Sequence, residues 1–149
     1  MKTDIINSQK ATIGVEKTVN DKLIPAIDES KYMGLHNNVT SRPELFNFAL
    51  ALGLKEKRTK INRIVSLWRW EQMSDEDLCI YDSIWFSEEK DSNNLQGILS
   101  GPKVISIVEE YANTGFQKIE NTMDSETDEN FAFSLILEMN EIIKDIDSL

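Results

Sequence analysis

The feature that most constrains the fold is a largely apolar run, Leu45 to Leu54, with helix signals on both sides. Pro43 suits the first turn of a helix, and Glu44 is favoured near the positive end of the helix dipole. Gly53 is predicted to form a left-handed C-terminal cap. Because apolar side chains fall on nearly every side of this helix, other elements must cover it. The run therefore predicts a central core helix.

Three later segments also carry helical signals. A helix over 75–89 follows Ser74, an N-cap with an acidic residue three positions on. A second begins at Pro102, after a polar loop. The last, about 127–147, has the clearest amphipathic pattern in the chain. Its apolar stripe consists of Ala132, Leu135, Ile136, Met139, Ile142, Ile143 and Ile146.

These segments predict a mainly α fold, a compact bundle of four to five helices. Residues 61–73 are ambiguous and fit either helix or a short strand or hairpin. Residues 1–40 predict a short helix or an irregular arm. With 149 residues and 40% apolar content, the chain is expected to form a single domain, 1–149. One cysteine excludes an internal disulfide, and no apolar stretch reaches membrane-spanning length, so a soluble cytoplasmic protein without membrane contact is expected.

The net charge of −10 is unevenly distributed along the chain. Residues 1–54 hold six Lys/Arg and six Asp/Glu, and residues 71–149 hold four and nineteen, a net of −15. Residues 55–70, hereafter the basic segment, hold six Lys/Arg and one Glu, a net of +5. The acidic half would repel the phosphates of nucleic acid and would suit a basic protein surface.

The basic segment is the candidate site for an acidic partner protein or DNA. Its cations alternate with Trp68 and Trp70, a combination that nucleic-acid surfaces use for phosphate neutralisation and base stacking. The alternative interpretation is that the cations complement a helix dipole and the tryptophans belong to the core. The six cations are Lys55, Lys57, Arg58, Lys60, Arg63 and Arg69.

No catalytic signature is present in the sequence. His36 is the only histidine, and no nucleophile elbow, phosphate-binding loop or zinc-protease motif occurs. The acidic pairs lack the spacing of a calcium loop and are expected to face solvent. We therefore expect a non-enzymatic protein with no catalytic residues, no cofactor and no metal. The acidic pairs are Glu88–Glu89, Glu109–Glu110 and Asp128–Glu129.

Two blocks, RPELFNFALALGLKEKR (42–58) and VEEYANTGFQKIE (108–120), together resemble a known family. It comprises small accessory proteins associated with bacterial Dnd DNA-phosphorothioation loci and with related antiphage defence clusters. In that family an apolar helix ending in an "A-LG" turn with basic residues precedes an "EYAN-G" helix. The matching positions are Phe46, Ala49, Ala51, Leu52, Gly53 and Lys55, then Glu110, Tyr111, Ala112, Asn113 and Gly115.

The resemblance implies a biological context and supplies no catalytic residues. It implies antiviral and anti-plasmid defence through larger partners, an SMC-type ATPase and a nuclease effector. The expected protein is a non-enzymatic accessory subunit that binds and regulates or bridges them, with DNA contacted only through the complex. Its expected partner surfaces are the basic segment and the exposed side of the acidic C-terminal helices. Two alternatives stay open: a small DNA-binding protein, or an acidic DNA mimic that inhibits a DNA-binding enzyme.

Overall fold

A computed structural model of the chain describes residues 12–30, 41–88, 101–125 and 128–147. This part is mainly helical with five α-helices, as the sequence predicted, and it also contains a two-stranded sheet. His36 lies outside it. The elements are β1 (Thr12–Glu16), the π-helical turn η1 (Val19–Leu23), α2 (Ile24–Ser30), α3 (Arg42–Gly53), β2 (Ile64–Arg69), the 3-10 turn η2 (Trp70–Gln72), α4 (Asp75–Glu88), α5 (Gly101–Ser125) and α6 (Asp128–Asp147).

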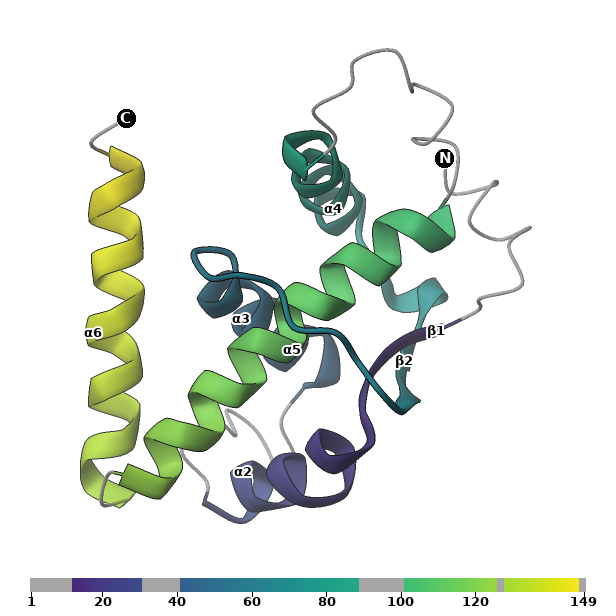
Figure 1. The fold of residues 1–149 in the computed structure, drawn as a ribbon. Helices are drawn as coiled ribbons and strands as arrows, with labels where there is room; N and C mark the ends of the chain where they lie inside the picture. Colours follow the sequence, from purple (N-terminus) through teal and green to yellow (C-terminus); the bar gives the residue numbers. More distant parts are fainter. Residues whose placement is uncertain (1–11, 31–40, 89–100, 126–127, 148–149) are drawn as a thin grey trace.

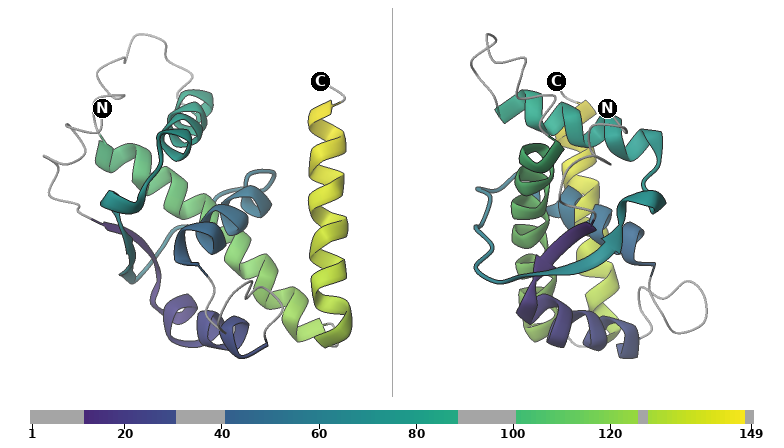
Figure 2. Two further views of the ribbon diagram at one scale, coloured as in Figure 1. Left: turned by 180° about the vertical axis from the view of Figure 1, so that it is seen from behind. Right: turned by 90° about the vertical axis from the view of Figure 1, so that its right-hand side faces the viewer.

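The longest helix, α5, crosses the whole molecule and organises the other elements (Figure 1). The shorter α3 packs across its middle, and this is the most extensive helix contact in the fold. The two strands and α6 lie on opposite sides of the molecule (Figure 2). As the sequence predicted, α3 is buried on most sides. No described helix is long and apolar enough to span a bilayer.

The α3–α5 crossing depends on two glycines that let the helix backbones touch. A Cβ on Gly53 would lie 2.9 Å from the carbonyl carbon of Tyr111, and a Cβ on Gly115 would lie 2.5 Å from that of Ala49. The predicted left-handed cap at Gly53 is wrong, because Gly53 is the last helical residue and Leu54 follows with φ −62°. Glycine is needed there for the close approach of the helices.

The ambiguous stretch near 61–73 contains strand β2, which pairs antiparallel with β1. The pairing shifts register between Ile13 and Gly14: Ile13 lies opposite Trp68, but Gly14 lies opposite Ser66. Residues 12–30 are therefore not an irregular arm, since they supply this strand and two helical turns with buried apolar side chains. Residues 1–11 and 31–40 lie outside the described part.

The start of α4 follows the predicted capping pattern. Ser74 donates its hydroxyl and its N–H to Oδ2 of Asp77 at 2.8 and 2.9 Å, and Asp77 N–H donates to Ser74 Oγ at 3.0 Å. Asn47 on α3 donates to the other oxygen of Asp77 at 2.7 Å and accepts a hydrogen bond from Tyr81 at 2.7 Å. The cap thus also joins α3 to α4.

Candidate functional site

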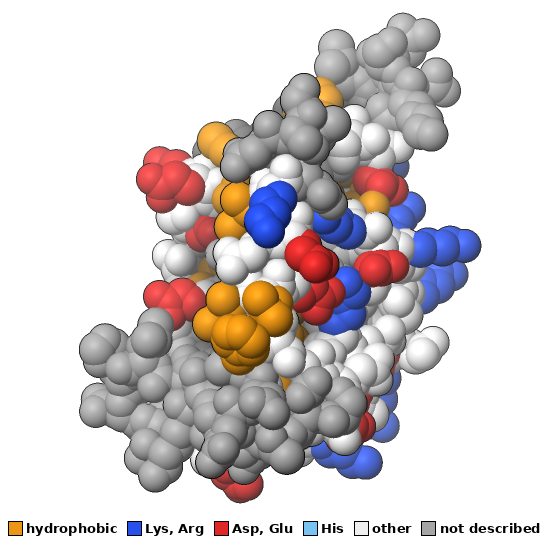
Figure 3. All heavy atoms as spheres, turned by 90° about the vertical axis from the view of Figure 1, so that its left-hand side faces the viewer, with side chains coloured by type: hydrophobic (Ala, Val, Ile, Leu, Met, Phe, Trp, Pro, Cys, Tyr) orange, Lys and Arg blue, Asp and Glu red, His pale blue; other side chains and the backbone are white. Residues whose placement is uncertain are grey.

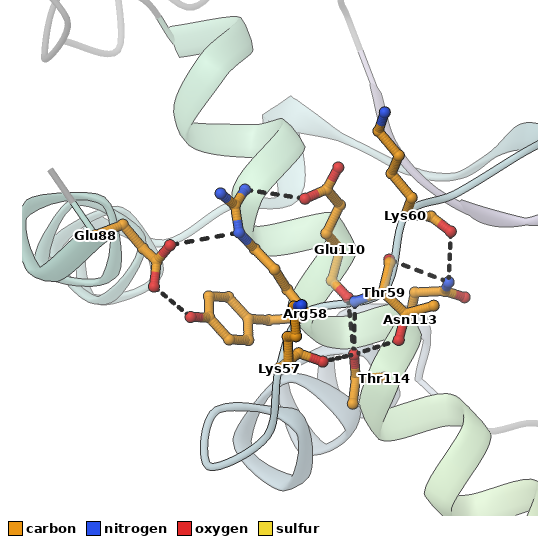
Figure 4. Close-up of polar contacts among 9 residues, drawn as sticks. Lys57, Arg58, Thr59, Lys60, Glu88, Glu110, Asn113 and Thr114 are labelled. Carbon is orange, nitrogen blue, oxygen red and sulfur yellow. Dashed lines mark hydrogen bonds and ion pairs between the residues drawn. The ribbon is translucent and has the colours of Figure 1, made fainter.

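Most of the basic segment is the link between α3 and β2, and this link runs along the surface of α5 (Figure 4). A link of this kind would be free to move if only its side chains touched the helix. Here its backbone is bonded to α5 at several points. All six cations of the segment are solvent-exposed: Lys55, Lys57, Arg58, Lys60, Arg63 and Arg69.

Two polar residues of α5 fix the backbone of the link. The amide N–H of Thr59 donates to Thr114 Oγ1 at 2.9 Å and lies 3.3 Å from the carbonyl oxygen of Glu110. The side-chain amide of Asn113 donates to the backbone carbonyl oxygens of Thr59 and Lys60 at 3.4 and 3.5 Å. Asn113 and Thr114 are only 3% and 8% exposed, so their polar groups need these partners. Backbone N–H and carbonyl groups of the link are therefore both hydrogen-bonded to α5.

Arg58 forms ion pairs with acids of two helices. Its Nε lies 3.3 Å from Oε2 of Glu88, at the end of α4, and its Nη1 lies 2.9 Å from Oε2 of Glu110 on α5. The Tyr111 hydroxyl also donates to Glu88. Burial, followed by this hydrogen bond, raises the pKa of Tyr111 to about 12. Arg58 thus contributes to the attachment of the link, and its charge is balanced within the molecule.

Three other cations of the link are less engaged. Within the described ranges, Lys57, Lys60 and Arg63 form no ion pair, and in Figure 4 no polar contact is drawn to the Lys60 ammonium. Arg63 is held through its backbone, since its N–H donates to Glu16 Oε1 at 3.0 Å. The arrangement is a set of exposed positive charges on a backbone that α5 holds in place.

Trp68 does not form a stacking surface with these cations. Trp68 is 3% exposed, and its ring packs against Phe46 with a centroid separation of 6.2 Å. It therefore belongs to the core, as the alternative interpretation predicted, and stacking of a base on this ring is excluded. The side chain of Trp70 lies outside the described part.

One acidic residue differs sharply from the expectation of a solvent-facing pair. Glu109 is 2% exposed and accepts a hydrogen bond from the N–H of Gly14 at 2.7 Å, at the register shift of the sheet. A carboxylate at this position satisfies a backbone donor that lies beside the irregular pairing. Nothing in the sequence separates Glu109 from its neighbour Glu110, because the strand that it meets is far away along the chain.

The described acids do not assemble into a metal site: they include no group of three or more His, Cys, Asp or Glu side chains placed to hold an ion. The chemistry that the basic segment offers is recognition of negative charge. Its geometry depends on residues that sequence analysis did not select as site residues. These are Glu88, Glu110, Asn113 and Thr114.

Searches of curated proteins and of solved structures gave no significant match. A match to one protein family covers residues 20–147 and so includes the α3–α5 crossing, the basic segment and the residues that attach it. The chain therefore belongs to the family described as DNA sulphur modification system-associated protein 4, an accessory protein of Dnd systems.

Proposed function

We propose that the chain is a non-enzymatic accessory subunit of a cytoplasmic, multi-protein defence complex that acts against phage and plasmid DNA. In this proposal it binds a larger protein, an SMC-type ATPase or a nuclease effector, and regulates that protein or bridges it to another. DNA is contacted by the larger partner. The docking point is the link between α3 and β2, with Lys57, Lys60 and Arg63 facing an acidic surface.

One observation carries the proposal. The two sequence blocks that resemble the family are the two strips that meet at the α3–α5 crossing and attach the basic segment to α5. Glu110 and Asn113 of the second block contact Arg58 and Thr59 directly. A backbone fixed in advance loses less entropy when a partner binds than a mobile loop would. The cations are thus better suited to recognition than a random surface cluster.

The test is a binding measurement with the purified products of the genes adjacent to that of this chain, starting with any SMC-type ATPase or nuclease among them. A double variant, Lys57→Glu with Lys60→Glu, reverses two exposed charges and leaves the backbone bonds in place. We expect it to bind about tenfold more weakly or worse, and more so at low salt. The matched control, Lys22→Glu with Lys103→Glu, makes the same change of charge at two exposed sites outside the link.

Equal loss in both variants would mean that only net charge matters, and would remove the link from the proposal. Wild-type protein that binds neither neighbour would refute the function itself. Melting curves of both variants establish that the charge changes leave the fold intact.

Direct DNA binding is the second candidate, because Lys57, Lys60 and Arg63 are exposed and form no ion pair with described residues. Against it stand the net charge of −15 on residues 71–149 and the burial of Trp68. Phosphate contacts are strongest at low salt. A mobility shift of duplex DNA at about 50 mM salt, abolished by the Lys57→Glu and Lys60→Glu double variant, would favour this candidate over protein docking.

A further inference from the structure

Helix α6 has apolar side chains on two opposite sides, and only one side is covered by the rest of the described chain. On the inner side, Phe131 and Leu135 are 2% and 3% exposed. Phe133, two residues from Phe131, is 61% exposed. Four large apolar side chains make up the outer face of α6, as we name it: Phe133, Ile136, Leu137 and Ile143, each about half exposed or more.

The outer face is arranged as a single stripe. Its residues follow Phe133 at i+3, i+4 and i+10, spacings that bring them to one side of a helix. Apolar side chains gather on the face of the molecule that α6 occupies, and Lys and Arg side chains lie on the same face (Figure 3). Exposed apolar side chains that are grouped in this way on a small protein commonly mark an interaction site.

The helix that carries this stripe is joined to the body by ion pairs. Lys118 on α5 forms ion pairs with Glu138 on α6 and, at 3.3 Å, with Glu56 of the basic segment. Burial lowers the pKa of Lys118, but the two carboxylates outweigh it and raise that pKa overall. The ion pairs link α6 to the basic segment through one side chain. The outer face is thus presented by a helix whose other side is anchored.

Charge distinguishes among the possible occupants of the outer face. The sequence of α6 has six Asp/Glu and one Lys, a net of −5. Pairing the same face of two copies would bring two such helices together, and like charges oppose that contact. A groove that is apolar at its centre and carries Lys or Arg on its rim complements both the stripe and the charge.

We infer that the outer face of α6 docks into an apolar groove with a basic rim on a larger protein, in the manner of an amphipathic helix in a groove. This inference rests on the proposed function and gives it a second contact surface, separate from the basic segment. The helix supplies Phe133, Ile136, Leu137 and Ile143 as anchors. Glu141, an exposed carboxylate of the helix, faces the rim.

The experiment compares two double variants for binding to the purified products of the adjacent genes, starting with any SMC-type ATPase or nuclease among them. Phe133→Gln with Leu137→Gln removes the centre of the outer face. Ile80→Gln with Phe86→Gln makes an equal change at two apolar residues of α4 that are 50% and 52% exposed. We expect the first variant to bind about thirtyfold more weakly or worse and the second to bind like wild type. Far-ultraviolet circular dichroism and melting curves check that both variants remain helical.

A single substitution tests the charge part of the inference. Glu141→Lys reverses an exposed charge on α6 and leaves the apolar anchors unchanged. A basic rim predicts weaker binding and a shallower dependence on salt. Unchanged affinity would show that the groove has no basic rim, and would overturn the stated partner chemistry.

The outcomes separate the inference from the proposed function. If a neighbour binds wild type and the Phe133→Gln with Leu137→Gln variant equally, the docking of α6 is refuted and the function stands. If wild type binds no neighbour, both fail. Light scattering tests whether a second copy of the chain occupies the outer face. If wild type is a dimer and the Phe133→Gln with Leu137→Gln variant is a monomer, the outer face is a dimer interface and the inference is overturned.

Discussion

The α3–α5 crossing and helix α6 both bury apolar side chains, but they are held in different ways. At the crossing, Gly53 and Gly115 bring two helix backbones together, and Asn113 and Thr114 bond the basic segment beside them. Helix α6 relies on Phe131, Leu135 and one lysine with two carboxylates, and its outer face is exposed. The first region is thus fixed by backbone contacts, whereas α6 is a helix that is anchored on one side and exposed on the other.

The largest effect is expected from breaking the crossing. In an ordinary helix, changing Gly115 to Ala would stabilise the protein by about 1 kcal/mol through helix propensity. Here the new Cβ would meet the backbone of Ala49, which cannot move without displacing α3. We expect Gly115→Ala to destabilise the fold by about 3 kcal/mol or more, measured by urea unfolding.

Glu120→Ala, at an exposed position of the same helix, is the control and should change stability by about 0.5 kcal/mol or less. Stabilisation by Gly115→Ala would mean that the helices are not in backbone contact.

A second pair of variants compares the two sides of α6. Phe131→Ala removes a buried ring and should lower the free energy of unfolding by about 3 kcal/mol. Phe133→Ala removes an exposed ring and should change it by about 0.5 kcal/mol or less. Equal losses in urea unfolding would show that the outer face is packed within the chain, and would leave no surface there for a partner.

Removing the Arg58 ion pairs should have a smaller effect. Arg58→Met keeps most of the aliphatic stem and removes the charge that Glu88 and Glu110 share. Because these groups are partly exposed, we expect a loss of about 1 kcal/mol or less in urea unfolding. That loss should shrink in high salt, since exposed ion pairs are screened. A loss that is independent of salt would point to packing of the stem instead.

Alkaline pH is expected to weaken both regions by modest amounts. Tyr111 at the crossing has a pKa of about 12, against an ordinary value of 10.0, so the unfolded chain releases this proton first. The pKa of Lys118 is raised above its ordinary value of 10.5. Its contribution to stability is therefore present below pH 10.5 and is lost as the pH rises further. Stability should therefore fall as pH rises from about 10 to about 12.

Two variants isolate the contributions of Tyr111 and Lys118 to this pH dependence, since Tyr81, whose pKa burial also raises, contributes to the fall in every variant. Tyr111→Phe, at the crossing, should lose less stability between pH 9 and pH 11 than wild type does, and so should Lys118→Met, beside α6. The free energy of unfolding is measured with urea at both pH values. A fall that is equally steep in both variants and in wild type would contradict the assignments.

The sequence predicted the helices because their signals are local. Each signal acts within a few residues. The signals are the cap that Ser74 forms with Asp77, Pro43 in the first turn of α3, and the apolar stripe near the C-terminus. Strand β1 was not predicted, because it is short and its partner β2 is about fifty residues away. For the same reason Gly53 was wrongly assigned to a cap: an approach between two distant helices leaves no local pattern.

The candidate site was predicted only in part. The six cations of the basic segment are exposed, but the sequence did not indicate that Arg58 is neutralised, and it left both stacking and burial open for Trp68. It marked Asn113 only as part of the family resemblance and gave no reason to select Thr114, although both hold the segment through its backbone. Contacts of this kind depend on where a loop crosses a helix, and that is set by the tertiary fold.

Amide hydrogen exchange at Thr59 tests most directly whether α5 fixes the basic segment. The Thr59 N–H donates to the Thr114 hydroxyl at 2.9 Å and, at the longer distance of 3.3 Å, to the Glu110 carbonyl oxygen; Thr114→Val removes the nearer acceptor while keeping the side-chain shape. We expect a protected Thr59 amide in wild type, faster exchange at Thr59 in Thr114→Val, and unchanged exchange along α6. A Thr59 amide that exchanges as fast as a free loop in wild type, or that stays fully protected in the variant, would contradict it.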